Sequence, residues 1–389
     1  MDTPYGLYIH IPFCRAKCGY CDFYSLARKA VPGDFVGLLQ RELELVIPQQ
    51  NASIRTVYFG GGTPSMLAPT EVGSILRTIR ELADLERNLE VTLEANPEHI
   101  DSQYVEGLLK AGVNRLSLGL QSLNDSTLQF LGRRHTAEHS VAAVRAAKAA
   151  GMPRICVDMM FGIPGESPFE LARSLEGYLA LNVGHISAYH LSYEEGTPFG
   201  HKVERQNITP IDDALSEELY LLVHRKLTGA GYEHYEVSNY ALPGQQSRHN
   251  TSYWLGSPYA GVGPAAHSYD GRCRRWWNPA SYARWGGQVM KGESAAGSEE
   301  LTAQELMEEW VMLGLRTAWG LDLDEGLRRF GAVAIDALRR HADPLIAAGY
   351  LISEGQQLRV PPERFLQSDW VIRQLLEERA IDCIIGAGN

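Results

Sequence analysis

The first predicted strand and the loop that follows it lie in one stretch of sequence, Tyr8-Ile9-His10-Ile11-Pro12-Phe13-Cys14-Arg15-Ala16-Lys17-Cys18-Gly19-Tyr20-Cys21-Asp22-Phe23. Three cysteines stand in the loop at C-x3-C-x2-C spacing. Thiolates at this spacing can hold three corners of a [4Fe–4S] cluster and leave one iron without a protein ligand. We therefore expect Cys14, Cys18 and Cys21 to be metal ligands, with the fourth iron open to a small molecule.

A zinc site is the alternative for clustered cysteines. A structural zinc site closes with a fourth Cys or His at a suitable spacing, and this stretch offers none. His10 lies upstream within the strand and is expected to be a packed side chain. An iron–sulfur cluster is therefore favoured over zinc. The three remaining cysteines, Cys156, Cys273 and Cys383, are expected to be spectators that take no part in the cluster.

Composition places the chain among globular proteins of a reducing compartment. The 389 residues are 44% hydrophobic, enough for one large domain and a smaller one. Three cysteines within eight positions of so long a chain do not resemble a secreted disulfide framework. We see neither a signal peptide nor an apolar run of membrane-spanning length and expect a cytoplasmic protein. The formal net charge of −11 disfavours non-specific binding of nucleic acid.

Short β-rich runs alternate with amphipathic helical stretches, which is typical of parallel βα units. The expected strands are Leu7–Ile11, Thr56–Phe59, Glu90–Leu93, Arg115–Leu118, Arg154–Met159 and His185–Leu191. The expected helices are Phe35–Leu45, Glu71–Leu82, Gln103–Ala111, Ala137–Ala150 and Phe169–Leu181. Six repeats predict an α/β fold with a partial (β/α)6 barrel of the TIM type. Polar or glycine-rich clusters follow the strands directly, so the site is expected at their C-terminal ends.

The sequence divides into three expected segments. Residues 1–240 form the partial barrel, residues 241–298 an aromatic-rich connecting region, and residues 299–389 a C-terminal helical domain that resembles a winged helix. Residues 301–389 contain nine Arg, no Lys and fourteen Asp or Glu. Contact with nucleic acid needs the opposite balance of charge, so we interpret this last domain as a packing module.

The cluster loop resembles that of the radical S-adenosylmethionine (SAM) superfamily, and the wider set of motifs resembles the oxygen-independent coproporphyrinogen III oxidase family. The resemblance runs over nearly the whole chain and implies that the open iron binds SAM. It also implies that residues at the strand ends contact SAM. These residues lie in Gly60-Gly61-Gly62-Thr63-Pro64, Leu93-Glu94-Ala95-Asn96-Pro97, Gly119-Leu120-Gln121-Ser122 and Leu131-Gly132-Arg133-Arg134-His135, and at Asp158 near the end of the fifth predicted strand. The residues that match the SAM contacts and the flanking aromatics are Tyr8, Tyr20, Gly61, Gly62, Thr63, Glu94, Gln121, Arg133 and Asp158.

Two departures separate this chain from the family's oxidases. Those enzymes carry a further cysteine two positions after the third cluster ligand, where this chain has Phe23. They also carry an N-terminal extension, whereas this chain enters its first strand by about Tyr5. Instead, Arg248-His249-Asn250-Thr251-Ser252-Tyr253-Trp254 resembles the His-Asn-x-x-Tyr-Trp motif of a heme chaperone branch of the family.

The motif suggests a heme site, because imidazole is a good axial ligand to heme iron and aromatic rings can cover a porphyrin face. His249 is the expected ligand, and His267 is a second candidate. The motif follows the sixth βα unit, which would place it near the barrel mouth yet apart from the cluster loop. A histidine that merely caps a loop is the alternative.

Two functions remain open on this basis. The first is a heme chaperone that holds a [4Fe–4S] cluster, SAM and heme and passes heme to respiratory heme proteins. The second is a radical SAM enzyme that acts on a tetrapyrrole propionate, as coproporphyrinogen III oxidase does. Phe23 and His249 favour the first, so no residue is assigned to catalysis. The expected partners are heme, recipient heme proteins of respiratory chains and an electron donor; a homodimer and peripheral membrane association are compatible with this function.

Overall fold

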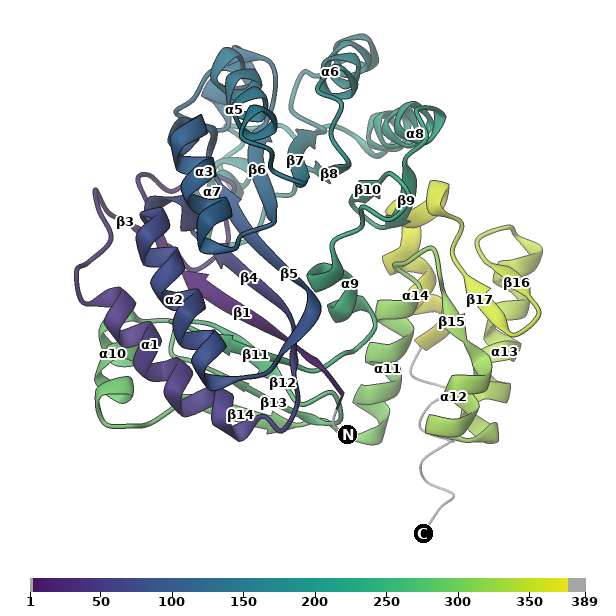
Figure 1. Ribbon diagram of the computed structural model, residues 1–389. Helices are drawn as coiled ribbons and strands as arrows, with labels where there is room; N and C mark the ends of the chain where they lie inside the picture. Colours follow the sequence, from purple (N-terminus) through teal and green to yellow (C-terminus); the bar gives the residue numbers. More distant parts are fainter. Residues whose placement is uncertain (1–2, 377–389) are drawn as a thin grey trace.

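Six parallel strands form the centre of the fold, and each coincides with a predicted strand. The computed structural model describes residues 3–376 (Figure 1). The strands are β1 (Tyr5–Ile11), β4 (Ile54–Gly61), β5 (Leu85–Ala95), β6 (Arg115–Gln121), β7 (Arg154–Phe161) and β8 (His185–His190). They pair in that order, parallel throughout. The predicted α/β partial barrel is confirmed, and only β5 begins well before its predicted first residue.

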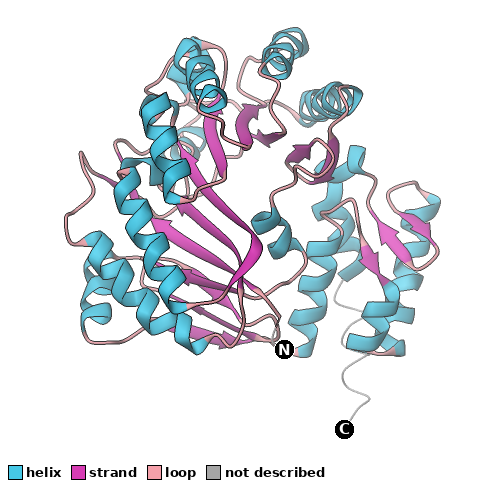
Figure 2. Ribbon diagram, in the orientation of Figure 1, coloured by secondary structure: helices cyan, strands magenta, loops and turns pink. Residues whose placement is uncertain are grey.

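Helices cover the outer face of this sheet (Figure 2). They are α1 (Phe35–Val46), α2 (Pro69–Leu82), α3 (Ser102–Ala111), α5 (Ala137–Ala149), α6 (Pro168–Ala180) and α8 (Asp213–Gly229). Two short helices, α4 (Asp125–Phe130) and α7 (Pro198–Glu204), instead pack together through Phe130 and Phe199, and the Phe199 N–H donates to the Gly19 carbonyl oxygen of the cysteine loop at 2.9 Å. Several begin at polar residues whose side chains accept from free backbone N–H groups, as Asp101 does from Tyr104 and Ser167 from Glu170. Short 3-10 turns occur at Ile47–Gln49, Pro64–Met66 and Pro97–His99.

The sheet extends beyond the six parallel strands at both edges, to twelve strands in all. The antiparallel pair β9 (Glu233–Glu236) and β10 (Asn239–Ala241) continues it beyond β8. On the other side β11 (Tyr259–Val262) pairs parallel with β1. A meander follows, made of β12 (His267–Tyr269), β13 (Arg274–Trp277) and β14 (Gly297–Glu300). Residues 241–298, the expected connecting region, thus supply β11, β12, β13 and the start of β14 to the main sheet, together with the helices α9 (Arg248–Trp254) and α10 (Tyr282–Met290).

Alternation along the strands gives the barrel a polar inner face. In β1, Leu7 and Ile9 are fully buried in the core shared with the outer helices, and Tyr8 and His10 have the opposite orientation. Helix α9 enters the inside of the barrel next to the start of β1, where a Cβ on Gly6 would lie 3.2 Å from the His249 ring. The inner face therefore carries functional groups, and α9 fills the end of the barrel opposite the cysteine loop.

The C-terminal unit is a separate small layer of helices and strands beside the barrel (Figure 1). It consists of α11 (Ala303–Gly314), β15 (Leu321–Asp322), α12 (Leu323–Phe330), α13 (Ala332–Ala347), β16 (Ile352–Glu354), β17 (Gln357–Arg359), a 3-10 turn at Pro362–Gln367 and α14 (Ser368–Leu376). The strands pair in the order β15-β17-β16. Helices with a short hairpin agree with the expected winged-helix-like unit; residues 377–389 of the expected segment lie outside the described residues.

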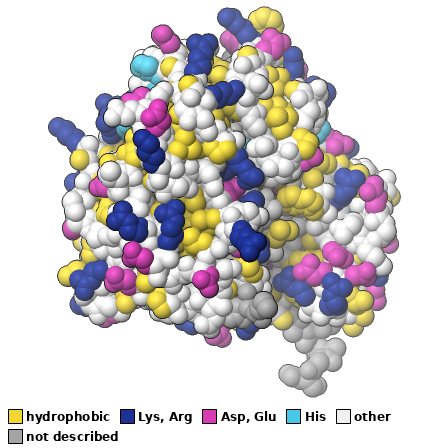
Figure 3. Space-filling model, viewed as in Figure 1, with side chains coloured by type: hydrophobic (Ala, Val, Ile, Leu, Met, Phe, Trp, Pro, Cys, Tyr) yellow, Lys and Arg dark blue, Asp and Glu magenta, His cyan; other side chains and the backbone are white. Residues whose placement is uncertain are grey.

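Basic and acidic side chains are interspersed over the face of the molecule seen in Figure 3. No helix within residues 3–376 is long and apolar enough to cross a membrane.

Candidate functional site

The cysteine loop is fastened at both ends. The short strand β2 (Phe13–Cys14) pairs in parallel with β3 (Leu26–Ala27). The Arg28 N–H donates to the Cys14 carbonyl oxygen at 2.8 Å, which closes the loop. Cys14, Cys18 and Cys21 are free thiols at partly exposed positions. The loop thus holds three thiols at the C-terminal end of β1, the end of a barrel strand where active sites form.

Two of the three thiols receive hydrogen bonds from residues that follow other strands. Thr63 Oγ1 donates to Cys14 Sγ at 3.3 Å, and Arg133 Nη1 donates to Cys18 Sγ at 3.6 Å. Burial raises the pKa of the Cys14 and Cys21 thiols. The Thr63 bond and the Arg133 cation act in the other direction on Cys14 and favour its thiolate. This donor set fits a cluster held by thiolates.

Within residues 3–376, no three His, Cys, Asp or Glu side chains gather around one point as ligands of a single metal ion. A cubane does not need such a point, because each thiolate binds a different iron.

Arg133 is the centre of the polar network beneath the cysteine loop. Its Nη2 donates to Asn96 Oδ1 at 2.6 Å and to the Gly119 carbonyl oxygen at 2.8 Å. Asn96 Nδ2 in turn donates to Thr63 Oγ1 at 3.3 Å. Asn96 is not among the predicted contacts, although its place in Glu94-Ala95-Asn96-Pro97, directly after a strand, was a usable signal. The network brings together the ends of β4, β5 and β6.

The glycine segment after β4 is shaped by the chain it lies against. Gly61 has φ +105°, and a Cβ there would lie 2.5 Å from the His10 ring. Gly62 donates from its N–H to the Ile11 carbonyl oxygen at 2.8 Å, and a Cβ there would lie 2.8 Å from that same oxygen. Both glycines are thus required for the segment to touch β1 and the start of the cysteine loop. Their predicted contact with the amino group of SAM stays a prediction.

Glu94 and Asp158 stand on the inner face near the strand ends. The Tyr58 hydroxyl donates to Glu94 Oε1 at 2.7 Å. Removal from water raises the pKa of Glu94 to about 7 and that of Asp158 to about 6, and the negative charge of Asp158 adds to the rise at Glu94. Both carboxyls line a small polar cavity of about 30 Å³. A cation bound here would stabilise both carboxylates, as the amine and sulfonium of SAM would.

Two further residues of the predicted SAM set, Gln121 and Tyr20, lie beside this network. Gln121 ends β6 with φ +65°, and its Nε2 lies 3.1 Å from where a Cβ on Gly119 would stand. Tyr20 packs edge-on against Phe199 with ring centroids 6.3 Å apart. The Arg133 cation lies close enough to Tyr20 to lower the pKa of its phenol, although burial raises that pKa more.

Cys156 lies in the polar interior of the barrel, and its expected role as a spectator of the cluster stays a prediction. Its Sγ lies 2.8 Å from His185 Nδ1 and 3.7 Å from Asp158 Oδ1. His185 Nε2 shares a hydrogen bond of 2.7 Å with the Tyr235 hydroxyl. Burial raises the pKa of Cys156 to about 12, so its thiol is a neutral donor toward Asp158.

His249 lies inside the barrel instead of at its mouth, and both of its ring nitrogens have partners. Nδ1 shares a hydrogen bond of 2.7 Å with Thr56 Oγ1, and Nε2 shares one of 2.8 Å with the Tyr253 hydroxyl. The ring is 1% exposed and stacks on Tyr58 with centroids 4.9 Å apart. Burial lowers the pKa of His249 to about 3. The predicted place of His249 near the mouth is therefore wrong, and coordination of heme by this residue would require both bonds to break.

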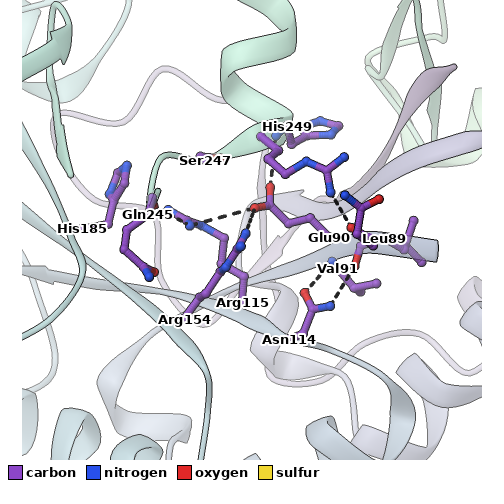
Figure 4. Close-up of polar contacts among 12 residues, drawn as sticks. Leu89, Glu90, Val91, Asn114, Arg115, Arg154, His185, Gln245, Ser247 and His249 are labelled. Carbon is purple, nitrogen blue, oxygen red and sulfur yellow. Dashed lines mark hydrogen bonds and ion pairs between the residues drawn. The ribbon is translucent and has the colours of Figure 1, made fainter. Parts of the chain in front are cut away.

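A buried ionic cluster fixes the segment that carries His249 (Figure 4). The backbone N–H of His249 donates to Glu90 Oε1 at 3.1 Å. Glu90 Oε2 pairs with Arg154 Nη1 at 3.1 Å, and Arg115 Nη1 donates to the Gln245 carbonyl oxygen at 3.0 Å. Glu90 and Arg115 are both 2% exposed. These contacts fasten residues 245–249 across the N-terminal ends of β5, β6 and β7.

Family models match both units of the chain. The radical SAM superfamily model matches residues 8–176, and the HemN C-terminal domain model matches residues 301–365. The crystallised coproporphyrinogen III oxidase HemN of Escherichia coli superposes with a TM-score of 0.82 and covers 97% of this chain and 91% of its own. Its sequence identity is 19%, so the likeness shows a shared fold.

Curated relatives are similar over almost the full length. The heme chaperone HemW of Mycobacterium tuberculosis is 37% identical over 383 residues, which cover 96% of this chain and 95% of the relative. The heme chaperone HemW of Escherichia coli is 36% identical over 355 residues, or 90% and 92% of the two chains. On this identity and coverage, the chain belongs to the HemW family of radical SAM proteins.

Proposed function

We propose that this protein is a heme chaperone of the radical SAM type that delivers heme to heme proteins of respiratory chains. Cys14, Cys18 and Cys21 would hold a [4Fe–4S] cluster, and the open iron would bind SAM. The observation that carries the proposal is the network in which Thr63 and Arg133 donate to two of these thiols. The HemW relatives, named as heme chaperones, supply the heme part of the proposal.

The chain's own residues have distinct tasks in this proposal. The carboxyls of Glu94 and Asp158 attract the cationic groups of SAM, and Arg133 fixes Asn96 and the thiol of Cys18. When bound, the cluster and SAM supply one-electron chemistry, which requires an electron donor. Tyr8 stacks between this site and His249, with a centroid distance of 6.4 Å to the His249 ring.

The competing function is oxidative decarboxylation of coproporphyrinogen III. Position 23 is a phenylalanine that is 67% exposed, where the oxidases of the wider family carry a cysteine. The shared fold with HemN does not decide between the two, because a fold hosts many functions.

The test compares two ligands on one preparation. The purified full-length chain, with its cluster reconstituted anaerobically, is mixed with heme and, separately, with coproporphyrinogen III plus SAM and a reductant. Stoichiometric heme binding with no release of CO₂ from the porphyrinogen is the expected result. Turnover of coproporphyrinogen III without binding of heme would contradict the proposal.

A further inference from the structure

A cavity of about 580 Å³ opens beside the cysteine loop, within the size range of small-molecule sites. It lies between Asp22–Tyr24, the end of α9, the strands β11, β12 and β13, and α11. Aromatic rings dominate its wall, contributed by Tyr8, Phe23, Tyr24, Tyr253, Tyr259 and Tyr269. A second hollow of about 460 Å³ shares Ala265 and His267 with it and adds Trp277 and Arg284. His267 thus stands between two adjoining hollows.

His267 differs from the other histidines here in its hydrogen bonds. His10 lines the same cavity, but its Nδ1 is bonded to the Tyr8 hydroxyl at 3.0 Å and its Nε2 to the Tyr24 carbonyl oxygen at 2.9 Å. His249 also has both nitrogens occupied. His267 is the exposed residue of β12, and within residues 3–376 neither of its ring nitrogens has a hydrogen-bond partner. A heme ligand needs such a free nitrogen.

The ring of His267 is held in place by the strand next to it. His267 and Trp277 are paired across β12 and β13, and their rings stack with centroids 5.9 Å apart and an angle of 27° between the planes. Partial burial, together with the Arg275 cation, lowers the pKa of His267. The imidazole is therefore neutral at pH 7, which is the form that binds iron.

Arginines flank His267 on both sides. Arg275 lines the first cavity, where Glu309 and Glu299 pair with it and where it lies over the Tyr269 ring at 5.7 Å. Arg284 lines the second hollow from α10 and is exposed. A planar apolar macrocycle that carries two carboxylates at its edge fits such a site. Its faces would contact the aromatic rings of the cavity wall, and a carboxylate at its edge would pair with an arginine guanidinium.

We propose that heme binds in this cavity with His267 as the axial ligand of its iron, ring faces of the cavity wall against the macrocycle, and Arg284 beside a propionate. This inference rests on the proposed function, that the chain carries heme, and moves the ligand from His249 to His267. The heme lies against Asp22 and Phe23, directly after the cluster ligand Cys21. Phe23, where the oxidases have cysteine, becomes an apolar wall of the heme site.

The ligand test uses the full-length chain with its cluster reconstituted. Ferric heme is titrated anaerobically, and each spectrum is recorded against the same variant without heme so that cluster absorption cancels. We compare the native chain with His267→Ala, His249→Gln and the exposed control His139→Ala. His267→Ala is expected to lose the imidazole-type spectrum and at least tenfold in affinity, and added free imidazole should restore the spectrum. The other two variants should match the native chain.

A second arm tests the propionate contact. Arg284→Glu should weaken binding of heme several-fold and leave binding of heme dimethyl ester, which has no free carboxylate, unchanged. Equal weakening for both ligands would contradict a propionate role.

The outcomes separate this inference from the proposed function. If the native chain binds no heme, the proposed function fails. If heme binds normally to His267→Ala and its spectrum changes in His249→Gln, the function stands and the cavity assignment is overturned. Loss of heme that imidazole does not restore would likewise contradict an axial role for His267.

Discussion

Arg133 donates from Nη1 to the Sγ of Cys18 at 3.6 Å, so a residue that follows β6 contacts a thiol that follows β1. The same guanidinium donates from Nη2 to Asn96 after β5. Thr63, after β4, donates to Cys14. One hydrogen-bonded network therefore joins the thiols of Cys14 and Cys18 to Thr63 and Arg133, two of the expected SAM contacts, and to Asn96.

Loss of any one of the three loop thiols should remove the cluster. We expect Cys14→Ala, Cys18→Ala and Cys21→Ala each to abolish the oxygen-sensitive chromophore, because two thiolates do not hold a cubane stably. Cys273→Ser is the matched control and should keep full iron and sulfide content. Iron and acid-labile sulfide analysis of the four variants is the measurement, and a cluster retained by any of the three alanine variants would refute the assignment.

Replacing Arg133 should make the cluster harder to reduce without removing it. Hydrogen bonds to sulfur and nearby positive charge both raise the reduction potential of an iron–sulfur cluster, and Arg133→Gln removes both. The potential, measured by EPR-monitored redox titration, should become more negative. The exposed neighbour Arg134 provides the control, since Arg134→Gln changes the same charge without the bond to Cys18. Equal shifts in both variants would mean that the bond has no special effect.

SAM binding should strengthen as pH rises through the titration of Glu94 and Asp158. The pKa of Glu94 is about 7 and that of Asp158 about 6 in the protein without ligand, so both carboxyls lose protons between about pH 5 and 8. Ionised carboxylates attract the cationic ligand, and loss of one charge-assisted bond costs on the order of 2 kcal/mol. Calorimetric titrations across this range should show a tighter Kd at higher pH for the native chain. The Glu94→Gln and Asp158→Asn variants should each show weaker binding and a flatter pH dependence; a native profile in both would place SAM elsewhere.

The parallel core and the strand-end site could be predicted because both are local in sequence. Thr63 comes just after β4, Glu94 lies near the end of β5, and Arg133 follows β6 after the short helix α4. Parallel strands bring their carboxyl ends, and the residues near them, to one edge. The meander of β12 to β14 could not be predicted from periodicity, because strands of three and four residues give too few alternations.

The place of His249 depended on contacts that the sequence does not display. Gly6 leaves room for the imidazole ring, and Glu90, far away in sequence, accepts from its backbone N–H. The polar and aromatic motif at residues 248–254 would have the same sequence whether it lined the mouth of the barrel or filled its interior. The signal that was available is Glu90 itself, a carboxylate at the first position of the predicted strand Glu90–Leu93.

His249 should prove structural. His249→Ala leaves the buried Thr56 hydroxyl and the Tyr253 hydroxyl without their partner, which should lower the free energy of unfolding by about 2–4 kcal/mol. His201→Ala, which removes only an exposed contact with Glu204, should change it by less than about 0.5 kcal/mol. Urea unfolding followed by circular dichroism measures both.

The titration of His249 gives a second, independent signature. Its folded pKa is about 3, below the usual 6.5, so the unfolded chain takes up a proton between these values that the folded chain does not. Its contribution to stability is therefore lost as pH falls from about 6.5 toward 3. The difference in stability between the native chain and His249→Ala should shrink over this range, and a constant difference would show that the ring is not buried as described.

Glu42 should be the residue that holds the loop before β12 in place. It is 1% exposed on α1, and its carboxylate accepts from the Gly263 N–H at 2.6 Å, from Trp285 Nε1 at 2.9 Å and from Asn278 Nδ2 at 2.5 Å. Glu42→Ala leaves these three buried donors without this acceptor, so we expect the free energy of unfolding to fall by on the order of 3 kcal/mol. Glu44→Ala, at an exposed position of the same helix, controls for the change in helix propensity and charge.

The conservative variant Glu42→Gln separates charge from shape at this position. Burial raises the pKa of Glu42 to about 7, despite the three donors that favour its ionised form. A carboxyl whose pKa is raised on folding costs stability as pH rises from its unfolded pKa to its folded pKa, because over that range the unfolded chain ionises and the folded chain does not. The native chain should therefore become less stable relative to Glu42→Gln between about pH 4.5 and 7, with no further change above that range. Because Gly263 is four residues before His267, Glu42→Ala should also weaken heme binding, whereas Glu44→Ala should not. Native heme affinity in Glu42→Ala, measured by the same difference titration, would show that the loop keeps its position without this carboxylate.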